Sequence, residues 1–374
     1  MKKTDTIPEI VTSLLQRYPV EGILNLALGE AVIVVRSNSS DLLNTLHTHF
    51  KEFLGPETQA DINIYALEGE PEPLPFTFTK KQPDPGKTRI KEEFVDIAGG
   101  RIVRKRLTDM VLMFDAKNHV AVGPCLANVN QVVNFINNRF IEWMLKRGSL
   151  LAHAAGILFQ NRGLALAGFS GSGKSTLALQ LLCNGASFVS NDRLMIEKHN
   201  DGLCMYGIPK HPRVNPGTIL SLEFLQGVMT EEDREATMKL DIETLWNLEK
   251  KHDVIVHEHF GEDRFKLSAP MNGLLILNWK RTKKPLIISE IYISKRRDLL
   301  NAFIKSPGLF FIPEPNAPAP DFSFRRYIEM LSGCHVFEAT GGVNFPEAVW
   351  FCRNFLEQDE QWTDFQTIEN KLPE

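Results

Sequence analysis

The sequence predicts an α/β protein with two domains, a smaller N-terminal α+β domain over residues 1–147 and a larger C-terminal domain over residues 148–374. Three observations lead to this prediction. The length of 374 residues is long for a single domain. A glycine-rich loop stands between a strand signal and a helix signal within residues 163–183. A β-hairpin signal follows it, which departs from the β-α alternation of doubly wound proteins.

The N-terminal domain is predicted to contain several strands and two helices. Apolar runs, alternation and turn residues predict strands at 31–35, 61–67, 93–97, 101–107, 111–115 and 119–122. Helical spacing predicts helices at 41–54 and 129–146. Five prolines between Glu70 and Gly86 indicate a connector. Arg147-Gly148 ends the second helix, and we therefore place the domain boundary there.

The C-terminal domain begins with a strand predicted at 163–167 and a helix predicted at 176–183, which Asn184-Gly185 ends. A second strand is predicted at 186–190, as a neighbour of the first. Two apolar runs around Asn200-Asp201-Gly202 predict the hairpin. Further strands are predicted at 274–279 and 287–293.

The loop between the strand predicted at 163–167 and the helix predicted at 176–183 contains a complete Gly-x4-Gly-Lys-Ser motif, Gly168 to Ser175. A strand, a glycine loop and a helix together point backbone N–H groups and the helix N-terminus at one anion. Lys174 can reach the outer phosphates of a nucleotide, and the Ser175 hydroxyl can ligate Mg²⁺. An ordinary glycine-rich turn would leave the Lys-Ser pair unexplained. The residues expected to bind nucleotide are Gly168, Ser170, Gly171, Ser172, Gly173, Lys174, Ser175 and Thr176.

Asp192 is the second candidate site residue, because it follows the strand predicted at 186–190 directly. A carboxylate at the carboxyl end of a strand beside the phosphate loop is placed to bind a metal ion or to act as a base. The alternative is a turn aspartate with no role in chemistry.

Composition limits the classes of function. A formal net charge of −4 argues against a general nucleic-acid-binding protein, and the basic stretch Arg101 to Arg106 is interpreted as a solvated strand face. No run of about 18 apolar residues occurs, so we expect no membrane span. Five scattered cysteines without a CxxC pair are typical of reduced thiols, which indicates a cytoplasmic protein. A homo-oligomer is compatible with the sequence.

Three elements at fixed spacing resemble the catalytic domain of bacterial HPr serine kinase/phosphorylase. They are Ala152-His153-Ala154-Ala155-Gly156, the loop from Gly168 to Thr176, and Val189-Ser190-Asn191-Asp192-Arg193-Leu194. The closer resemblance is to the HPr-kinase-related P-loop kinases, including the HprK-related kinase B group. It covers roughly residues 148–215, and more loosely the rest of the C-terminal half.

The resemblance implies a fold and a set of roles. The fold would be a P-loop kinase domain akin to the phosphoenolpyruvate-carboxykinase type, with a mixed sheet. Lys174 would hold the β- and γ-phosphates of ATP, Ser175 and Asp192 would bind Mg²⁺, and Asp192 would also take the proton of the acceptor hydroxyl. His153 would lie beside the transfer site. Taken alone, His153 would be interpreted as a structural histidine.

Two departures from the family pattern are visible. The acidic pair of the family is Asn191-Asp192 here, so one carboxylate is missing. The later glutamate-bearing signature with its Gly-Leu-Gly core is absent, and the segment from Tyr206 to Lys210 stands in its place. Reverse, phosphorolytic activity is therefore in doubt.

The leading hypothesis is an ATP- and Mg²⁺-dependent kinase whose hydroxyl acceptor is on a protein, a peptide or a small metabolite. The competing hypothesis is a nucleotide-hydrolysing switch or regulatory binding module. The sequence leaves open whether Lys210, Arg213 or the basic loop 280–284 contacts ligand or is only solvated.

Overall fold

The computed structural model describes residues 6–71, 73–83, 88–200, 202–241, 244–245, 248, 250–313 and 319–357. The chain divides into two compact units. The first consists of Met1–Arg147 and Pro307–Pro320, and the second of Gly148–Ser306 and Asp321–Glu374. The two domains predicted from the sequence, 1–147 and 148–374, were contiguous and did not include the return of Pro307–Pro320 to the first unit. It is fixed by hydrogen bonds that Arg101 and Arg139 donate to backbone carbonyls of Leu309 and Phe310.

The first unit is built on a mixed eight-stranded sheet in the order β1-β2-β3-β8-β7-β6-β5-β4. The pairs β2–β3 and β3–β8 are parallel and the others antiparallel. The strands are β1 (Gly22–Leu28), β2 (Ala31–Ser37), β3 (Ile62–Glu68), β4 (Thr79–Lys80), β5 (Glu92–Ile97), β6 (Gly100–Lys105), β7 (Val111–Phe114) and β8 (His119–Gly123). The proline-rich connector predicted at 70–86 therefore contributes a short edge strand.

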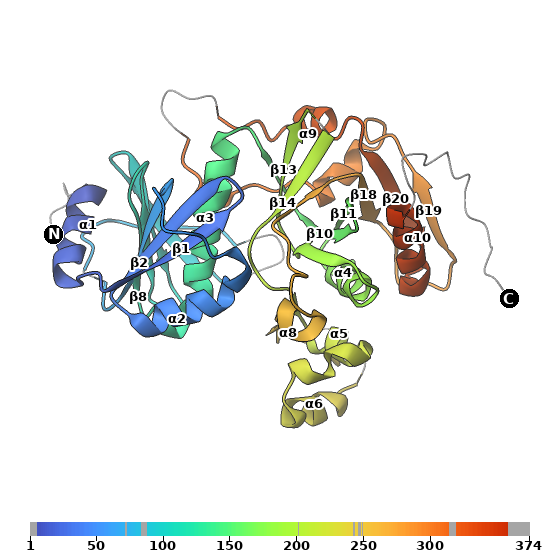
Figure 1. Cartoon of the computed structure of the whole chain (residues 1–374), viewed down its shortest axis with the longest axis horizontal. Helices are drawn as coiled ribbons and strands as arrows, with labels where there is room; N and C mark the ends of the chain where they lie inside the picture. Colours follow the sequence, from blue (N-terminus) through green and yellow to red (C-terminus); the bar gives the residue numbers. More distant parts are fainter. Residues whose placement is uncertain are drawn as a thin grey trace. The chain divides into compact units, whose positions relative to one another are not determined.

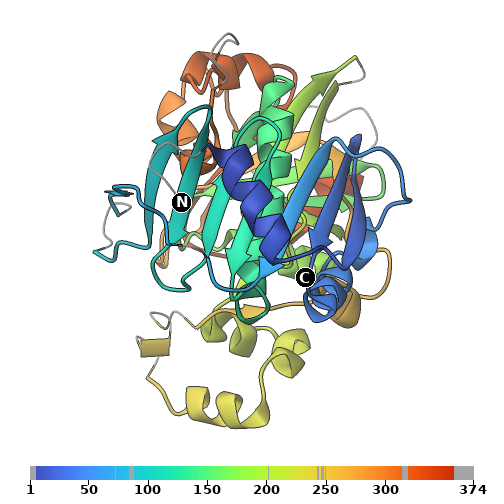
Figure 2. The ribbon, with the colours of Figure 1, turned by 90° about the vertical axis from the view of Figure 1, so that its left-hand side faces the viewer.

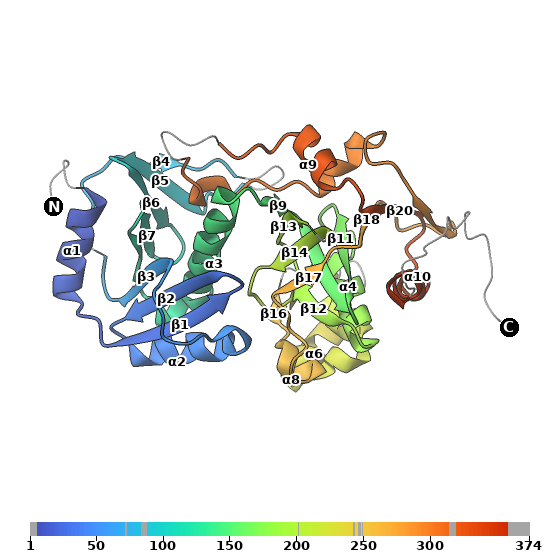
Figure 3. The same ribbon diagram turned by 45° about the horizontal axis from the view of Figure 1, so that its top comes forward.

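Helices cover both faces of this sheet (Figure 3). Helix α1 (Ile7–Arg17) crosses one face, as Figure 2 shows, and buries Ile7, Ile10 and Leu14 in a core with side chains from β3, β6, β7 and β8. Helices α2 (Ser40–His49) and α3 (Val129–Lys146) lie on the other face. Short 3-10 turns occur at Lys51–Phe53, Leu126–Asn128 and Gly308–Phe310.

The second unit has a mixed six-stranded sheet in the order β12-β10-β11-β18-β20-β19, in which β11–β18 and β18–β20 are parallel. Its strands are β12 (Ser187–Ser190), β10 (Ala154–Phe159), β11 (Arg162–Gly168), β18 (Gly273–Leu277), β20 (His335–Gly341) and β19 (Leu286–Glu290). A four-stranded antiparallel sheet contains β17 (Ser268–Pro270), β14 (Gly202–Gly207), β13 (Leu194–His199) and β9 (Leu150–Ala152), and a ribbon pairs β15 (Arg213–Val214) with β16 (His252–Asp253).

The two larger sheets of this unit pack face to face, and the small side chains of β11 allow a short distance between them. Ala165 and Ala167 point into the core shared with β9, β13 and β14, where small side chains let the sheets approach. Leu164 and Leu166 alternate with them and are buried on the opposite face. There α4 (Lys174–Cys183) and α10 (Phe345–Glu357) pack against the sheet (Figure 1).

Shorter helices complete the second unit. They are α5 (Pro216–Ser221), α6 (Glu231–Met238), α8 (Val256–Phe260) and α9 (Phe324–Met330), with 3-10 turns at Glu223–Val228 and Arg297–Ala302. The molecule is thus a mixed α/β protein with mixed sheets. No helix in the described part of the chain is both long enough and apolar enough to cross a membrane.

One predicted adjacency is wrong. The strand predicted at 186–190, observed as β12, does not neighbour β11, because β10 forms a hairpin with β11 and lies between the two. Since β12 and β11 are both antiparallel to β10, they run in the same direction. Their carboxyl ends therefore still meet at one edge of the sheet, where β10 begins.

Candidate functional site

The glycine-rich loop lies between β11 and α4, at the edge of the six-stranded sheet just described. Gly168 is the last residue of β11, and Lys174 is the first of α4. Gly173 precedes the helix with a φ of 93°, a left-handed conformation that side-chain-bearing residues rarely adopt. A Cβ on Gly173 would also lie 2.8 Å from the Phe345 ring. Glycine is therefore required here by both conformation and space.

Lys174 is buried inside the loop, with 8% of its surface exposed. Its Nζ donates hydrogen bonds to the carbonyl oxygens of Gly168 at 2.7 Å and Phe169 at 3.5 Å. Burial lowers the pKa of Lys174 to about 8, and the negative charge of Asp192 opposes that shift. The ammonium group is thus still mostly charged at neutral pH, and within the described part of the chain its hydrogen bonds go to these two backbone carbonyls.

Trp279 and Phe345 hold the loop from outside. Trp279 follows β18 closely, and its indole Nε1 donates a 2.7 Å hydrogen bond to the Ser172 carbonyl. Its ring meets Phe345 edge-on, with centroids 5.4 Å apart. Sequence reasoning missed both residues, because nothing local to either one indicates that β18 and α10 flank the loop.

Asp192 lies at the same sheet edge, two residues beyond the end of β12. Its Oδ1 is 3.1 Å from Nε2 of His153, and its Oδ2 is 3.2 Å from Nζ of Lys305 and 3.7 Å from Nε of Arg193. His153 immediately precedes β10, and its backbone N–H donates to the Phe303 carbonyl at 2.6 Å. The structure thus brings together His153 and Asp192, which the sequence singled out, and adds Lys305, which it did not.

Asp192 is strongly favoured as a carboxylate. Burial would raise its pKa, but the hydrogen bond from His153 and the charges of Lys305 and Arg193 outweigh burial and hold the pKa well below its usual range. Its side chain is 53% exposed, so it remains open to a ligand. Asp192 is therefore an ionised and accessible carboxylate, with oxygens that can accept hydrogen bonds, throughout the neutral pH range.

Residues that could hold Mg²⁺ are present. Ser175 follows Lys174 in the first turn of α4. The Oδ1 of Asn191 is buried and has no hydrogen-bond partner among the described residues, so an oxygen donor stands unused beside Asp192. In that part of the chain no three His, Cys, Asp or Glu side chains could hold a metal on their own. Mg²⁺ commonly takes only one or two carboxylates and completes its shell with phosphate and water, so this donor set fits it.

The remaining predicted residues lie in two places. Lys210 and Arg213 lie in the segment that follows β14, and Arg213 is the first residue of β15. Burial, the largest cause, lowers the pKa of Lys210 to about 8. Arg213 is fixed by an ion pair with Asp253, at 2.9 Å. The basic loop 280–284 instead joins β18 to β19 and is exposed.

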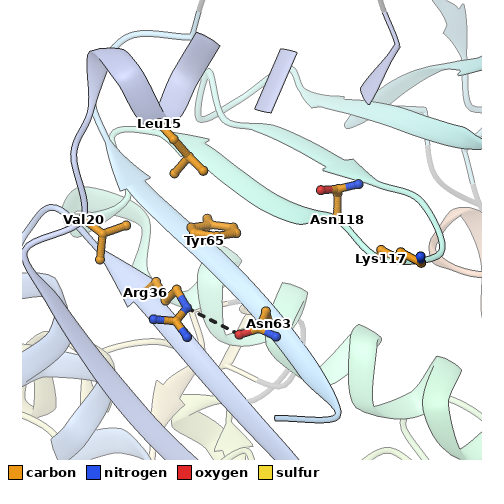
Figure 4. A pocket seen from close by; sticks show the side chains of 7 residues that line it. All are labelled: Leu15, Val20, Arg36, Asn63, Tyr65, Lys117 and Asn118. Atoms are coloured by element: carbon orange, nitrogen blue, oxygen red, sulfur yellow. Dashed lines mark hydrogen bonds between the residues drawn. The ribbon is translucent and has the colours of Figure 1, made fainter. Parts of the chain in front are cut away.

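The first unit carries an open depression of its own, with a volume of about 600 Å³ (Figure 4). None of the predicted site residues contributes to it. Arg36 donates a 3.4 Å hydrogen bond to Asn63, another residue of the lining, so part of the polar lining is already satisfied. It is lined by Leu15, Val20, Arg36, Asn63, Tyr65, Lys117 and Asn118.

No protein-family model matches the chain, and no curated protein matches it. One solved structure that it resembles is the HPr(Ser) kinase/phosphatase from Coxiella burnetii, with 13% sequence identity and a TM-score of 0.29. That similarity covers 55% of this chain and 89% of the other. A likeness of this size carries no argument for an activity, which must rest on the residues of the site.

Proposed function

We propose that this protein is an ATP- and Mg²⁺-dependent phosphotransferase that moves the γ-phosphate to a hydroxyl group, as an HPr-kinase-related P-loop kinase would. The observation that carries the proposal is the pairing of a buried, charged lysine inside a glycine loop with an ionised, accessible Asp192 at the same sheet edge. The charge of Asp192 acts directly on Lys174. A phosphate-binding loop and a carboxylate at this spacing are the two parts that phosphoryl transfer requires.

In this proposal each side chain has one task. Lys174 exchanges the carbonyl oxygens of Gly168 and Phe169 for phosphate oxygens. Ser175, Asp192 and Asn191 would hold Mg²⁺, which would neutralise charge on the β- and γ-phosphates when bound. The remaining loop residues offer backbone N–H groups to the same phosphates. Little covalent chemistry is asked of the protein, because alignment and charge neutralisation supply most of the catalysis.

In the proposed transfer step, Asp192 accepts the proton of the acceptor hydroxyl. The acceptor hydroxyl oxygen forms a bond to the γ-phosphorus, the bond from that phosphorus to the bridging oxygen breaks, and ADP leaves with the electron pair. Asp192 first orients the hydroxyl by accepting its hydrogen bond. Because the pKa of Asp192 is low, the proton moves late, when bond formation has made the hydroxyl acidic. His153 keeps Asp192 in place through Nε2.

The test is incubation of purified protein with γ-labelled ATP, Mg²⁺ and fractionated cell extract. We expect a discrete labelled acceptor with the wild type and none with Lys174→Ala, which removes a phosphate contact but little core volume. Lys283→Ala, in the exposed basic loop, is the matched control and should keep activity. Release of free phosphate without a labelled acceptor would instead favour the nucleotide-hydrolysing switch, and turnover by Lys174→Ala would contradict the phosphate-loop assignment.

A further inference from the structure

The open depression of the first unit lies on one face of the eight-stranded sheet, beside the last turn of α1, which supplies Leu15 (Figure 4). Arg36 on β2 pairs with Tyr65 on β3, and Asn63 lies two residues before Tyr65. The side chains of these three residues therefore share one face of the sheet. The volume of about 600 Å³ falls within the range of small-molecule sites, which is about 300–1,000 Å³.

One part of the lining is apolar and held in place. Leu15 and Tyr65 are partly buried and pack against the core that α1 forms with the sheet. Val20 is 36% exposed and lines the same depression. In the view of Figure 4 the Tyr65 ring lies between Leu15 and Asn63, so an apolar surface adjoins a polar one. A ligand bound here would cover an aromatic ring and two aliphatic side chains.

The polar part of the lining offers hydrogen-bond donors. Nε of Arg36 donates to Oδ1 of Asn63 at 3.4 Å. Because arginine can only donate, this bond turns the amide oxygen of Asn63 toward Arg36 and leaves its Nδ2 for another partner. Within the described part of the chain, no hydrogen bond involves that Nδ2 or the two Nη groups of Arg36. These three groups are donors that a ligand can use.

Lys117 adds a second positive charge from a fixed turn. Asp115 Oδ1 accepts the backbone N–H groups of Lys117 and Asn118, each at 2.7 Å, and Oδ2 accepts Nδ2 of Asn118 at 2.9 Å. The turn therefore has a defined shape, and Lys117 lines the depression from it. Among the described residues neither Lys117 nor Arg36 forms an ion pair, and no carboxylate lines the depression. The lining thus carries positive charge only.

We propose that this depression binds a small organic anion in which a carboxylate or phosphate group adjoins an aromatic or branched aliphatic group. Arg36 and Asn63 donate to the oxyanion, Lys117 adds charge, and the apolar group covers Tyr65 and Leu15. The forked donors of arginine suit both oxyanions. A cationic ligand would be repelled, and a neutral one would leave the charges unmatched. The site is separate from the proposed phosphotransferase function, because no residue of the phosphate loop lines it.

The experiment titrates phenylacetate into the ligand-free full chain at constant, low ionic strength and follows binding by ligand-observed NMR. We expect saturable binding with a dissociation constant of about 1–10 mM, which is typical of a ligand with about ten heavy atoms. Benzyl alcohol, which lacks the charge, and acetate, which lacks the ring, should bind at least about tenfold more weakly. Phenyl phosphate separates the two oxyanions, since tighter binding than phenylacetate indicates a phosphorylated ligand.

Variants assign the binding to the depression. Arg36→Gln should weaken phenylacetate at least about tenfold, because a charged, forked donor is lost. Lys117→Gln should weaken it about threefold, and this difference should vanish in about 0.5 M salt, which screens an exposed charge. Lys117 is exposed on a turn, so its variant tests the site even if Arg36→Gln fails to fold. The matched control is Lys80→Gln, on β4, which removes an exposed charge of the same unit outside the depression.

Three results would overturn the proposal. They are the absence of saturable phenylacetate binding to the wild type, benzyl alcohol that binds as tightly as phenylacetate, and phenylacetate that binds the Arg36 and Lys117 variants as it binds the wild type. The last result would place the anion elsewhere on the protein. None of them bears on the labelled-ATP experiment, so this proposal and the proposed function fail separately.

Discussion

At the scale of single residues, Asp192 differs from an ordinary turn aspartate in having three basic partners, the adjacent Arg193 and, from two other segments, His153 and Lys305. Replacing it with asparagine keeps its size but removes the charge and the ability to accept a proton. We expect Asp192→Asn to lower kcat by about a hundredfold or more with nucleotide affinity largely kept. Steady-state kinetics measure kcat, and calorimetry with a non-hydrolysable ATP analogue measures nucleotide affinity separately.

The neighbouring residue supplies the control for that experiment. Asn191→Asp adds a second carboxylate while Asp192 stays in place, so turnover should remain within roughly tenfold, equivalent to about 1.4 kcal/mol, or shift its metal preference. If Asp192→Asn kept near-full turnover, or lost folding and nucleotide binding together, Asp192 would be a structural turn residue.

Under the proposed function, the pKa of Lys174 should make nucleotide affinity depend on pH in the alkaline range. In the free protein Lys174 loses its proton near pH 8, well below the usual value for lysine. A bound phosphate favours the charged form, so binding takes up a proton above pH 8, and affinity should fall by up to about tenfold per pH unit there. Dissociation constants of the analogue between pH 6.5 and 9.5 measure this. Lys210→Met, which removes the other lysine with a pKa of about 8, should leave the slope in place.

The stability of the ligand-free protein should change with pH in the direction opposite to nucleotide affinity. The pKa of Lys174 is lower in the folded protein than in the unfolded chain, so between these two values the unfolded chain binds more protons. The free energy of unfolding of the ligand-free protein should therefore gain a contribution as pH rises from about 8 to about 10.4. A nucleotide affinity that stays flat through pH 8 would contradict the assigned role of Lys174.

At the scale of elements, the loop between β11 and α4 offers a matched pair of glycines. Gly171 and Gly173 both have positive φ, 79° and 93°, but a Cβ on Gly171 meets nothing within 4 Å, whereas one on Gly173 meets Phe345 at 2.8 Å. Gly171→Ala should cost only the strain of a left-handed alanine, about 1–2 kcal/mol. Gly173→Ala should cost more and also weaken nucleotide binding, because the start of α4 must move.

Denaturant unfolding and analogue binding of both variants test this comparison. If Gly171→Ala and Gly173→Ala lost equal free energy of unfolding, the Phe345 ring would be able to move away from the added methyl group at no cost. A larger loss in Gly171→Ala would contradict the assigned contact between Phe345 and the loop.

The elements that the sequence predicts well are those whose signals are local. The strand, loop and helix from Arg162 to Cys183 were predicted nearly to their ends, because an apolar run, glycines and helical spacing follow one another there. Helix α1 and strand β1 were missed, as were β10 and β20. The β10 segment Ala154–Phe159 is alanine- and glycine-rich at its start, and β20 carries Glu338 in its buried interior, so neither has a clear strand pattern.

The sequence could suggest a candidate site only through local signals. Lys174 was predicted from the glycine-loop motif, Asp192 from its place after a strand, and His153 from its spacing in the resemblance, and the structure brings His153 and Asp192 into contact. Lys305 was missed because 113 residues separate it from Asp192, and the contact arises only when the segment after Arg297–Ala302 folds back to the sheet edge. Such long-range pairs leave no trace in a single sequence.

At the scale of the whole molecule, the first unit is completed by a segment that follows most of the second unit in sequence. In that segment the Phe310 ring stacks on Phe114, with centroids 6.0 Å apart, and its carbonyl accepts a hydrogen bond from Arg139, which is 1% exposed. Phe310→Ala should destabilise the first unit by about 1–2 kcal/mol, since a half-buried aromatic ring is lost.

Hydrogen exchange of backbone amides in β6 and β7 of the full chain measures that loss. Leu309→Ala is the control, because the bond from Arg101 goes to the Leu309 backbone carbonyl and survives the change. Unchanged protection of β6 and β7 in Phe310→Ala would mean that the segment adds nothing to the stability of the first unit.

The return of Pro307–Pro320 also sets the order in which the protein can be completed during translation. About 160 residues separate Arg147 from Pro307, and a ribosome adds roughly 5–20 residues per second, so the segment arrives on the order of ten to thirty seconds after the rest of the first unit. Until then the Arg139 guanidinium lacks the Phe310 carbonyl, and Phe114 lacks its stacking partner. The first unit therefore reaches its final stability only after most of the second unit has been synthesised.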